Sequence, residues 1–290
     1  MNLWQEFKQP QSISEAIKDL QDAPKPVIPI AGGTDLLLDM RQGRHAPVHT
    51  LIDMTGIAEM NAIEIREQSL FIGAAVPVNR ILQNPLVNQH AQALIEACSL
   101  IAGPQVRNTA TLGGNVAHAL PAADGTIALT ALDTQAEVAS PSGLRKVPFV
   151  DLFAGPGKSA IDKQAELISG FYIPLIDQDQ ASCFNRIMRP QGVALPILNC
   201  AVWVYREADI ISDIRVAVGP GGPTPFRATS TENVLRGKAY TEETIEKAIQ
   251  NLLEQAKFRT SPRRATADYR RYVVTGLFRD TLSEAWQRAG

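Results

Sequence analysis

Two glycine pairs are the positions in this sequence best suited to binding a ligand, and the first is Ala31-Gly32-Gly33-Thr34-Asp35. It stands between a predicted strand, 27–31, and a predicted helix that begins at Leu36. Glycines let a backbone turn and approach a ligand closely. Successive N–H groups at the start of a helix form a cradle for phosphate oxygens. A strand–Gly-Gly–helix turn also serves as a plain connection, so this loop alone does not establish phosphate binding.

A second glycine site lies in the segment 103–125, GPQVRNTATLGGNVAHALPAADG. Thr111, Gly113, Gly114 and Asn115 again combine a hydroxyl, two small backbone positions and an amide, and we expect a helix to open at Asn115. Asp124 follows, and a carboxylate there suits hydrogen bonds from sugar or ribityl hydroxyls. The alternative is that Asp124 only caps the next helix. Two such loops can clamp the pyrophosphate of a dinucleotide between them.

Other chemistry-bearing residues do not form a site by their spacing. Gly157-Lys158-Ser159 resembles the end of a P-loop, but residue 152, where the first glycine belongs, is leucine. His118 follows the second glycine pair, and a place on a helix surface is favoured over a contact with a cofactor. No histidine has metal-ligand spacing with a cysteine or an acid. No residue stands out as an acid, base or nucleophile with a partner, which points to cofactor chemistry.

The elements that must position these loops predict an α+β chain. We expect helices at 12–21, from a capping box of Ser12 and Glu15, and at 86–100 and 125–132. Strands are predicted at 50–53, 62–66, 69–74, 135–139, 145–147, 197–206 and 210–218. The strands 135–139 and 145–147 should form a hairpin around Pro141-Ser142-Gly143. A polar connector at 174–184 separates a first domain from a second, in which a sheet precedes helices at 230–236, 241–257 and 264–288. Tyr172, Trp203 and Tyr205 have strand spacing and are expected to pack.

Composition excludes several classes of function. The 290 residues are 45% hydrophobic and 20% charged, with a formal net charge of −2, which gives no electrostatic case for nucleic acid. Arginines gather near the C-terminus, and we expect a solvated helix face or a subunit contact there. The sequence shows no signal peptide and no membrane span. Cys98, Cys183 and Cys200 form no C-x-x-C pair, which argues against a disulfide framework or an Fe–S or zinc site within this chain and favours a cytoplasmic location.

Taken together, AGGTDLL, PQVRNTATLGGN and PAAD resemble the FAD-binding subunit of the molybdenum hydroxylases, the family of xanthine dehydrogenase and carbon monoxide dehydrogenase. DLFAGPGKS at 151–159, VGPGGPTPFRA at 218–228 and SPRRATADYRRYVV at 261–274 support the resemblance, which covers residues 1–285. The segment 151–159 is more similar to the xanthine dehydrogenase branch than to the carbon monoxide branch.

The resemblance implies a fold, two domains and a set of cofactor-binding residues. Residues 1–176 would be an FAD-binding domain of the vanillyl-alcohol-oxidase/cell-wall-reductase type with two α/β subdomains. Residues 182–290 would form the C-terminal domain, a small antiparallel sheet plus helices. The residues that would bind FAD are Pro29, Ile30, Ala31, Gly32, Gly33, Thr34, Asp35, Leu36, Ile101, Thr111, Gly113, Gly114, Asn115, Asp124, Ile168 and Arg186. The two glycine loops would hold the diphosphate, and Ile168 would lie near the flavin ring.

The sequence departs from the family pattern in the strand that opens the second domain. Relatives place a lysine two residues after an aromatic and an aspartate ten residues after it, whereas Phe184 is followed by Arg186 and Ala194. Arg186 keeps a positive charge, which favours a reduced, anionic flavin. An arginine is bulkier than a lysine and keeps its proton. Because the aspartate is missing, we expect no family-type ion pair at this place.

The family further implies partners and a role. Hydroxylation would occur at a molybdenum cofactor on a large subunit, and electrons would pass through two [2Fe–2S] clusters of a small subunit to FAD on this chain. NAD⁺, oxygen or a quinone would be the terminal acceptor. The substrate stays open among xanthine, carbon monoxide, aldehydes and N-heterocycles. Two other classes also stay open: an autonomous NAD(P)H-dependent flavin reductase and a non-catalytic scaffold without FAD.

Overall fold

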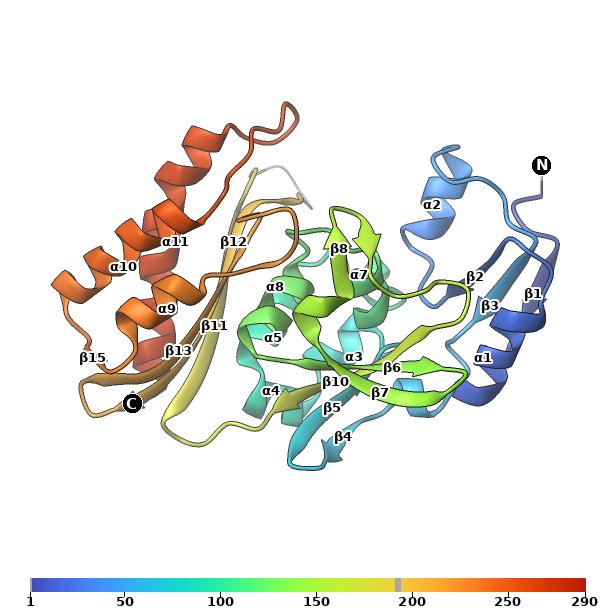
Figure 1. Cartoon of the computed structure of the whole chain (residues 1–290), viewed down its shortest axis with the longest axis horizontal. Helices are drawn as coiled ribbons and strands as arrows, with labels where there is room; N and C mark the ends of the chain where they lie inside the picture. The colour runs from blue at the N-terminus through green and yellow to red at the C-terminus, as the bar shows by residue number, and fades with distance from the viewer. Residues whose placement is uncertain (1, 191–193) are drawn as a thin grey trace.

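The structure is a computed structural model that describes residues 2–190 and 194–290. Three successive sheets, each with helices packed against it, follow one another along the chain and across the molecule (Figure 1). A separate two-stranded hairpin, β8 (Phe153–Gly155) with β9 (Lys158–Ser159), projects from the middle unit. No helix among the described residues combines the length and the apolar character that crossing a membrane requires.

The N-terminal unit is a small parallel sheet with two helices. Its strands are β1 (Glu6–Lys8), β3 (Thr50–Asp53) and β2 (Val27–Ile30) in that spatial order, and its helices are α1 (Ile13–Asp22) and α2 (Leu36–Arg41). Ser12 caps α1 by accepting from the Glu15 N–H at 3.2 Å, and the Glu15 carboxylate accepts from the Gln11 N–H at 2.7 Å. The capping-box spacing therefore located this helix correctly.

The middle unit is an antiparallel sheet with helices on one side. Its strands run in the order β4 (Ile63–Arg66), β5 (Ser69–Gly73), β10 (Leu167–Pro174), β6 (Gln135–Ser140) and β7 (Gly143–Pro148). Its helices are α3 (Val78–Leu82), α4 (Pro85–His90), α5 (Gln92–Ser99), α6 (Pro104–Arg107), α7 (Leu112–Ala117) and α8 (Asp124–Ala131). Single turns of 3₁₀ helix occur at Glu59–Asn61 and Phe149–Leu152. The prediction of one helix over 86–100 is wrong, because Ala91, at φ −143°, breaks it into α4 and α5.

The C-terminal unit is a second antiparallel sheet with three helices on its outer face. Its strands are β11 (Gln180–Met188), β12 (Pro196–Glu207), β13 (Ile210–Gly219), β14 (Phe226–Arg227) and β15 (Lys238–Ala239). Its helices are α9 (Thr229–Leu235), α10 (Glu242–Gln255) and α11 (Ala267–Arg288). The predicted connector 174–184 is too long, since β11 begins at Gln180, where it pairs with Tyr205 of β12. Pairing with a long apolar neighbour holds this polar segment in a strand.

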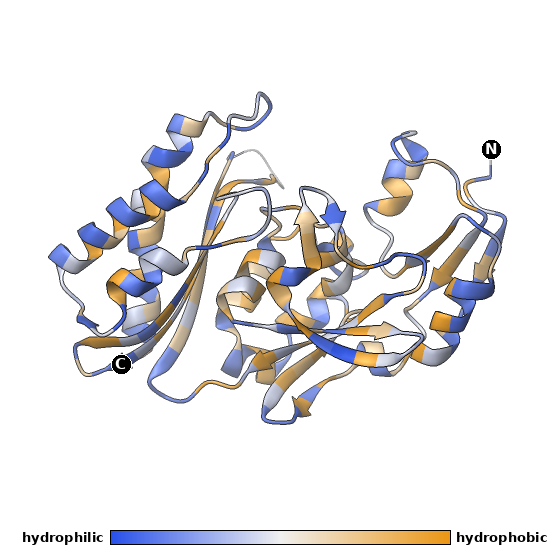
Figure 2. Ribbon diagram, in the orientation of Figure 1, coloured by the Kyte–Doolittle hydropathy of each residue, from blue (hydrophilic) through white to orange (hydrophobic). Residues whose placement is uncertain are grey.

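Helix α8 joins the middle and C-terminal units. All eight of its residues are buried, as expected of a helix enclosed on every side. Phe184, Ala201, Trp203 and Ala217 of the C-terminal sheet belong to the same hydrophobic cluster as the middle unit. The opposite face of that sheet packs on α9–α11 in a second cluster. Figure 2 shows this arrangement, with hydrophobic residues along the interior strands and hydrophilic ones over α10 and α11.

The observed architecture confirms the predicted fold class. Helices and sheets are mixed along the first part of the chain, and an antiparallel sheet followed by helices completes it (Figure 1). The segment that connects β10 to β11, residues 175–179, overlaps the predicted division between residues 176 and 182, which extends into β11.

Candidate functional site

The first glycine loop connects β2 to α2 and offers free backbone donors. Gly33 has φ +65°, a left-handed conformation that favours glycine. The backbone N–H groups of Gly33, Thr34, Asp35 and Leu36 have no acceptor among residues 2–190 and 194–290. The loop is half-buried, with Asp35 exposed. Successive unpaired N–H groups in a turn bind anions, so this loop is suited to a phosphate group.

The two glycine loops touch each other through their backbones. A Cβ added to Gly32 would lie 2.2 Å from the carbonyl oxygen of Thr109 and 2.8 Å from Cα of Ala110. Only glycine permits this approach, because a real Cβ cannot come within 3.0 Å of such an atom. Gly32 therefore serves the contact between the loops, while Gly33 and the residues after it present their amides.

The second loop uses its backbone donors within the protein. Helix α7 starts at Leu112, three residues before the predicted start at Asn115, and Thr111 caps it by accepting from the Gly114 N–H at 3.1 Å. The N–H groups of Leu112, Gly113 and Asn115 bond to carbonyls of Val76, Ala74 and Thr111. Gly113 is buried against Ala74, whose carbonyl oxygen would lie 2.5 Å from an added Cβ. Exposed Gly114 and half-buried Asn115 are thus the parts of this loop that a ligand can reach.

Asp124 does not cap helix α8 and instead links it to the C-terminal sheet. Its Oδ2 pairs with Nη1 of Arg186 at 2.5 Å, and its Oδ1 accepts from Nδ2 of Asn199 at 2.7 Å. Asp124 is the first residue of α8, and no side chain caps that helix. Burial raises the pKa of Asp124, and the charge of Arg186 and the hydrogen bond from Asn199 counteract that rise. The capping alternative for Asp124 is wrong.

Arg186 has an acidic partner that its own strand does not supply. The absence of an acid at Ala194 led us to expect no ion pair, but Asp124 of α8 provides the carboxylate. The side chains of both partners are only 5% exposed. The sequence expectation failed because the partner comes from a helix that precedes Arg186 by 62 residues.

Buried polar atoms without partners surround this ion pair. Within the described residues, Nε of Arg186, Oδ1 of Asn115 and Oδ1 of Asn199 have no hydrogen-bond partner. Asn115 also adjoins α8, because a Cβ added to Gly125 would lie 3.0 Å from its Oδ1. Native proteins seldom leave such groups unsatisfied. This polar lining suits a ligand rich in hydroxyl and phosphate oxygens, and FAD fits that description.

The two predicted isoleucine contacts lie in different surroundings. Ile168 is half-buried in β10, next to Ser169, whose carbonyl accepts from the Ala74 N–H at 3.0 Å beside the second glycine loop. Ile101 is half-buried in the loop after α5. Nη1 of Arg107 holds that loop by donating to carbonyls of Ser99, Ile101 and Ala102 at 3.0, 3.0 and 2.8 Å.

Sequence reasoning missed two residues of this region, Asn199 and Arg107. Asn199 is completely buried and donates to Ala122 and Asp124. It is the one polar side chain in the apolar stretch 197–204, and an amide in such a run signals a buried hydrogen-bonding role. Arg107 is the last residue of α6, and nothing in the local sequence marks its three carbonyl acceptors.

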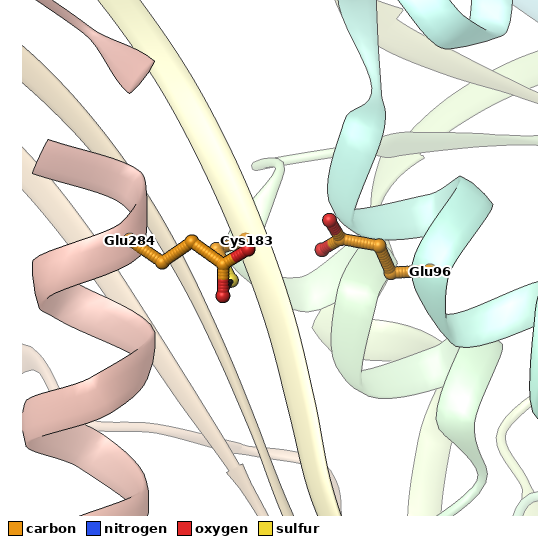
Figure 3. A group of neighbouring side chains, drawn as sticks. All are labelled: Glu96, Cys183 and Glu284. Carbon is orange, nitrogen blue, oxygen red and sulfur yellow. Dashed lines mark hydrogen bonds between the residues drawn. The ribbon is translucent and has the colours of Figure 1, made fainter. Parts of the chain in front are cut away.

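Three other groups of polar residues have structural roles and are not part of the candidate site. Cys183, Glu96 and Glu284 converge between β11, α5 and α11 (Figure 3), with Cys183 Sγ 3.3 Å from Glu284 Oε2. Arg288 pairs with both carboxylates, and Glu96 also accepts from the Phe184 N–H, so these oxygens already bind protein groups.

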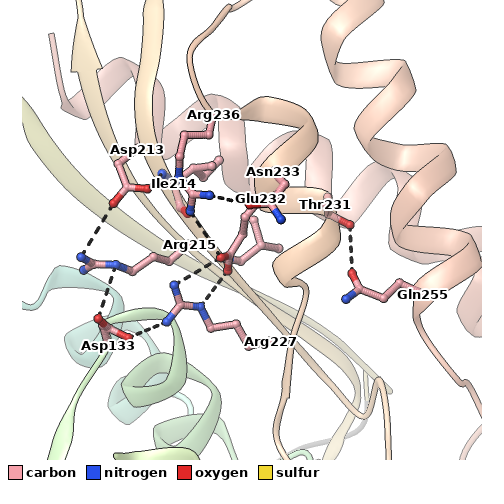
Figure 4. Close-up of polar contacts among 11 residues, drawn as sticks. Asp133, Asp213, Ile214, Arg215, Arg227, Thr231, Glu232, Asn233, Arg236 and Gln255 are labelled. Carbon is pink, nitrogen blue, oxygen red and sulfur yellow. Dashed lines mark hydrogen bonds and ion pairs between the residues drawn. The ribbon is translucent and has the colours of Figure 1, made fainter.

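A second network joins Asp133 after α8 to Arg215 and Arg227 of the C-terminal sheet (Figure 4). Lys158 and Ser159 form β9 of the hairpin and not the helix start that a P-loop requires.

Comparison with known proteins identifies the chain. The family model described as the FAD binding domain in molybdopterin dehydrogenase matches residues 4–176. The model described as the CO dehydrogenase flavoprotein C-terminal domain matches residues 182–285. The chain belongs to the FAD-binding subunits of the molybdenum hydroxylases, as the resemblance predicted, and its cofactor is FAD.

Relatives match over nearly their whole length. The chain is 29% identical over 280 residues to the xanthine dehydrogenase FAD-binding subunit of Escherichia coli O157:H7, covering 96% of this chain and 95% of that one. It is 30% identical over 282 residues to the nicotine 6-hydroxylase medium subunit of Paenarthrobacter nicotinovorans, with 97% of each chain covered. A chain in the structure of carbon monoxide dehydrogenase from Hydrogenophaga pseudoflava superposes with a TM-score of 0.92 at 28% identity, covering 99% of this chain and 98% of that one. The chain is thus a flavoprotein subunit of an oxidoreductase.

Proposed function

We propose that this chain is the electron-transfer subunit of a xanthine dehydrogenase-like complex. It takes electrons from the [2Fe–2S] clusters of a small subunit and passes them to NAD⁺ or another acceptor, while a large subunit carries the molybdenum cofactor. The observation that carries the proposal is the contact between the two glycine loops, because it joins the loop with the unpaired amides of residues 33–36 to the loop whose Asn115 adjoins α8.

The residues proposed to hold FAD have separate tasks. Pro29 to Leu36 would bind the diphosphate through the free amides of that loop, and Thr111 to Asn115 would form the opposite wall. Asp124, Arg186 and Asn199 would orient the ribityl or ribose hydroxyls. Ile101 and Ile168 would supply apolar contacts. In this proposal residues 1–176 form the FAD-binding domain, and 182–290 close the site from the other side.

The role of this chain is to position a cofactor and to set its electrostatics. When bound, FAD supplies the electron exchange, and the side chains of this chain perform no bond chemistry. Arg186 keeps a positive charge at the site while Asp124 holds its guanidinium in place. The buried helix α8 keeps that pair away from solvent. The three cysteines are all buried and unpaired, which accords with work in the reducing cytoplasm.

The proposed xanthine branch rests on DLFAGPGKS at 151–159. Relatives named for xanthine, carbon monoxide, nicotinate and nicotine have 28–30% identity, so the overall identity does not favour one substrate. A flavoprotein subunit does not touch the substrate of the molybdenum centre, and its sequence reports that substrate only indirectly.

The proposal is tested by purifying the chain with what accompanies it in its native source. We expect FAD, molybdenum and iron in the complex, with xanthine oxidation coupled to NAD⁺ reduction. Another oxidised substrate would correct the branch, and preference for oxygen or a quinone would correct the acceptor. A coloured chain that reduces substrates from NAD(P)H without metal subunits would identify a flavin reductase. A chain that stays colourless with FAD, even within the complex, would identify a scaffold.

A further inference from the structure

Five arginines converge at one end of the C-terminal unit. Arg189 follows β11, Arg259, Arg263 and Arg264 lie in the loop between α10 and α11, and Arg270 lies near the start of α11 (Figure 1). Nη2 of Arg189 donates to the carbonyls of Arg263 and Arg264 at 2.9 and 3.5 Å. Nη1 of Arg270 donates to the carbonyl of Arg259 at 2.6 Å. We refer to these five residues as the arginine cluster.

The arginine cluster has no acidic partner. Within residues 2–190 and 194–290, none of its members forms an ion pair, although many arginines elsewhere do. Those paired residues are Arg44, Arg66, Arg145, Arg186, Arg215, Arg227, Arg236, Arg279 and Arg288. The chain as a whole has 30 acidic residues and 28 lysines and arginines, so the excess of positive charge is confined to the arginine cluster.

Positive charge in the cluster is partly buried and uncompensated. Arg270 is only 1% exposed, and its Nε has no acceptor within the described residues. Burial lowers the pKa of Arg264 and of Arg270, and the charge of Arg259 lowers both further. Holding like charges together without counter-charge destabilises the isolated chain, and a bound anionic surface removes that cost.

Exposed side chains of interface type flank the cluster. Tyr269 is 44% and Tyr272 80% exposed on α11, one helical turn apart, and Met188 is 37% exposed beside Arg189. Tyrosine, methionine and arginine are enriched in protein–protein interfaces, where tyrosine and arginine often dominate the binding energy. Nucleic acid is a poorer match, because the chain as a whole has a net charge of −2.

The cluster borders the candidate FAD site along β11. Nη2 of Arg186, whose other nitrogen pairs with Asp124, lies 3.0 Å from Sδ of Met188. Arg189 follows three residues after Arg186, which in extended chain is about 10 Å. A protein seated on the arginine cluster therefore lies beside Arg186, one of the residues of the candidate FAD site.

We propose that the arginine cluster, with Tyr269 and Tyr272, is the docking surface for the iron–sulfur subunit, which meets it with a patch of aspartates and glutamates. This inference rests on the proposed function, since it presupposes an iron–sulfur partner. The iron–sulfur subunit is favoured over the molybdenum subunit because the surface adjoins the FAD site, and the direct electron donor must approach that site.

The test is assembly of the co-expressed three-subunit complex carrying Arg263→Glu together with Arg264→Glu. The matched control is Lys238→Glu with Lys247→Glu, which makes the same charge change on exposed residues of the same unit. Reversing charge at an interface places like charges opposite each other. We expect the dissociation constant for the iron–sulfur subunit to rise at least about tenfold in the Arg263/Arg264 variant and to be unchanged in the control. Arg263→Lys with Arg264→Lys should retain binding, and that binding should weaken with added salt.

Three outcomes would overturn the docking proposal: unchanged affinity in the glutamate variant, an equal loss in the control, or selective loss of the molybdenum subunit. Retardation of duplex DNA by the wild-type chain at physiological salt would assign the cluster to nucleic acid instead. The melting temperature of the variant chain, measured alongside, should be at least that of the wild type, because the substitutions relieve repulsion within the cluster. If the wild-type chain recruits no iron–sulfur subunit, the proposed function itself fails. If the wild-type complex forms and the variant complex forms equally well, only the docking surface is wrong.

Discussion

Nη1 of Arg186 lies 2.5 Å from Oδ2 of Asp124, and this ion pair joins β11 of the C-terminal sheet to the first turn of α8. Both side chains are 5% exposed, and Asn199 of β12 occupies the other carboxylate oxygen. The contact thus ties three elements from two parts of the chain around one buried charge. It gives Asp124 a structural task in addition to its proposed contact with FAD.

Removing one partner of this pair should cost far more than removing a surface charge. Asp124→Asn leaves the Arg186 guanidinium buried without its counter-charge, and we expect a loss of about 3–5 kcal/mol in the free energy of unfolding. Asp133→Asn, at the other end of α8, breaks a pair with Arg227 in which Asp133 is 51% exposed. That control should cost at most about 1 kcal/mol. Denaturant titration of the purified chain measures both.

A double substitution distinguishes the loss of the ion-pair attraction from the cost of leaving one buried charge unpaired. Asp124→Asn combined with Arg186→Met removes both charges, so the combined loss should be smaller than the sum of the two single losses. Additive losses would show that Asp124 and Arg186 act independently and would contradict the ion-pair account.

Gly114→Val should remove FAD while leaving the chain folded. Gly114 is exposed and has an ordinary helical conformation, and the nearest atom to an added Cβ is Oγ1 of Thr111 at 3.1 Å. Valine costs little in a helix, so we expect the melting temperature to change by only a few degrees. Flavin absorbance of the assembled complex should fall to background, because the new side chain projects into the proposed diphosphate site. Normal flavin content would move the diphosphate away from this loop.

Gly32→Ala is the companion change and, unlike Gly114→Val, should disturb the fold as well as FAD binding. Its Cβ would collide with the Thr109 carbonyl oxygen at 2.2 Å, so the two loops must separate. We expect both flavin content and thermal stability to fall. Gly33→Val is less informative than Gly114→Val, since φ +65° at Gly33 strains any branched residue even when no ligand is present.

The sequence predicted best what is encoded locally. Ser12 and Glu15 correctly predicted the start of α1, and Pro141-Ser142-Gly143 correctly predicted the turn between β6 and β7. Both predictions succeeded because caps and turns depend on residues that are neighbours in the sequence. Strand β11 was shortened in the prediction, since its polar start is held by pairing with β12 and not by its own propensity. The break at Ala91 within an apolar helical pattern carried no local signal.

The site shows the same division between local and long-range information. Glycines and polar residues marked both loops, but their contact at Gly32 and Thr109 depends on how distant segments pack. The partner of Arg186 is 62 residues away, and no spacing rule connects it to Asp124. Thr111 is predicted to contact FAD, and the structure adds that its hydroxyl caps α7. A hydroxyl before Gly-Gly has both uses, and only the backbone geometry distinguishes them.

His90 should make stability depend on pH in the mildly acidic range. Nδ1 of His90 accepts from the Ile176 N–H at 3.3 Å in the segment that connects β10 to β11, and the residue is 8% exposed. Burial lowers the pKa of His90 below the ordinary histidine value of 6.5. The unfolded chain therefore takes up a proton at higher pH than the folded chain, and stability is lost as pH falls from about 6.5 toward the folded pKa.

Thermal unfolding between pH 8 and pH 5 checks this prediction. The wild type should be most stable above pH 6.5 and lose stability below it, and His90→Gln should flatten that part of the profile. His118→Gln is the matched control, because His118 is exposed at the end of α7. An equal flattening in both variants would exclude His90 as the source.

Arg107→Gln should loosen the loop that carries Ile101. One nitrogen of Arg107 serves three carbonyls, including that of Ala102, which has the left-handed φ of +46°. Charge-assisted hydrogen bonds of this kind contribute about 1.5–3 kcal/mol, so a loss of that size in unfolding free energy is expected. Arg107→Lys should recover only part of it, because a lysine ammonium is more strongly hydrated than a guanidinium and stands on a more flexible stem. Hydrogen exchange at residues 99–103 should accelerate in Arg107→Gln, and unchanged exchange there would show that packing, and not Arg107, holds the loop.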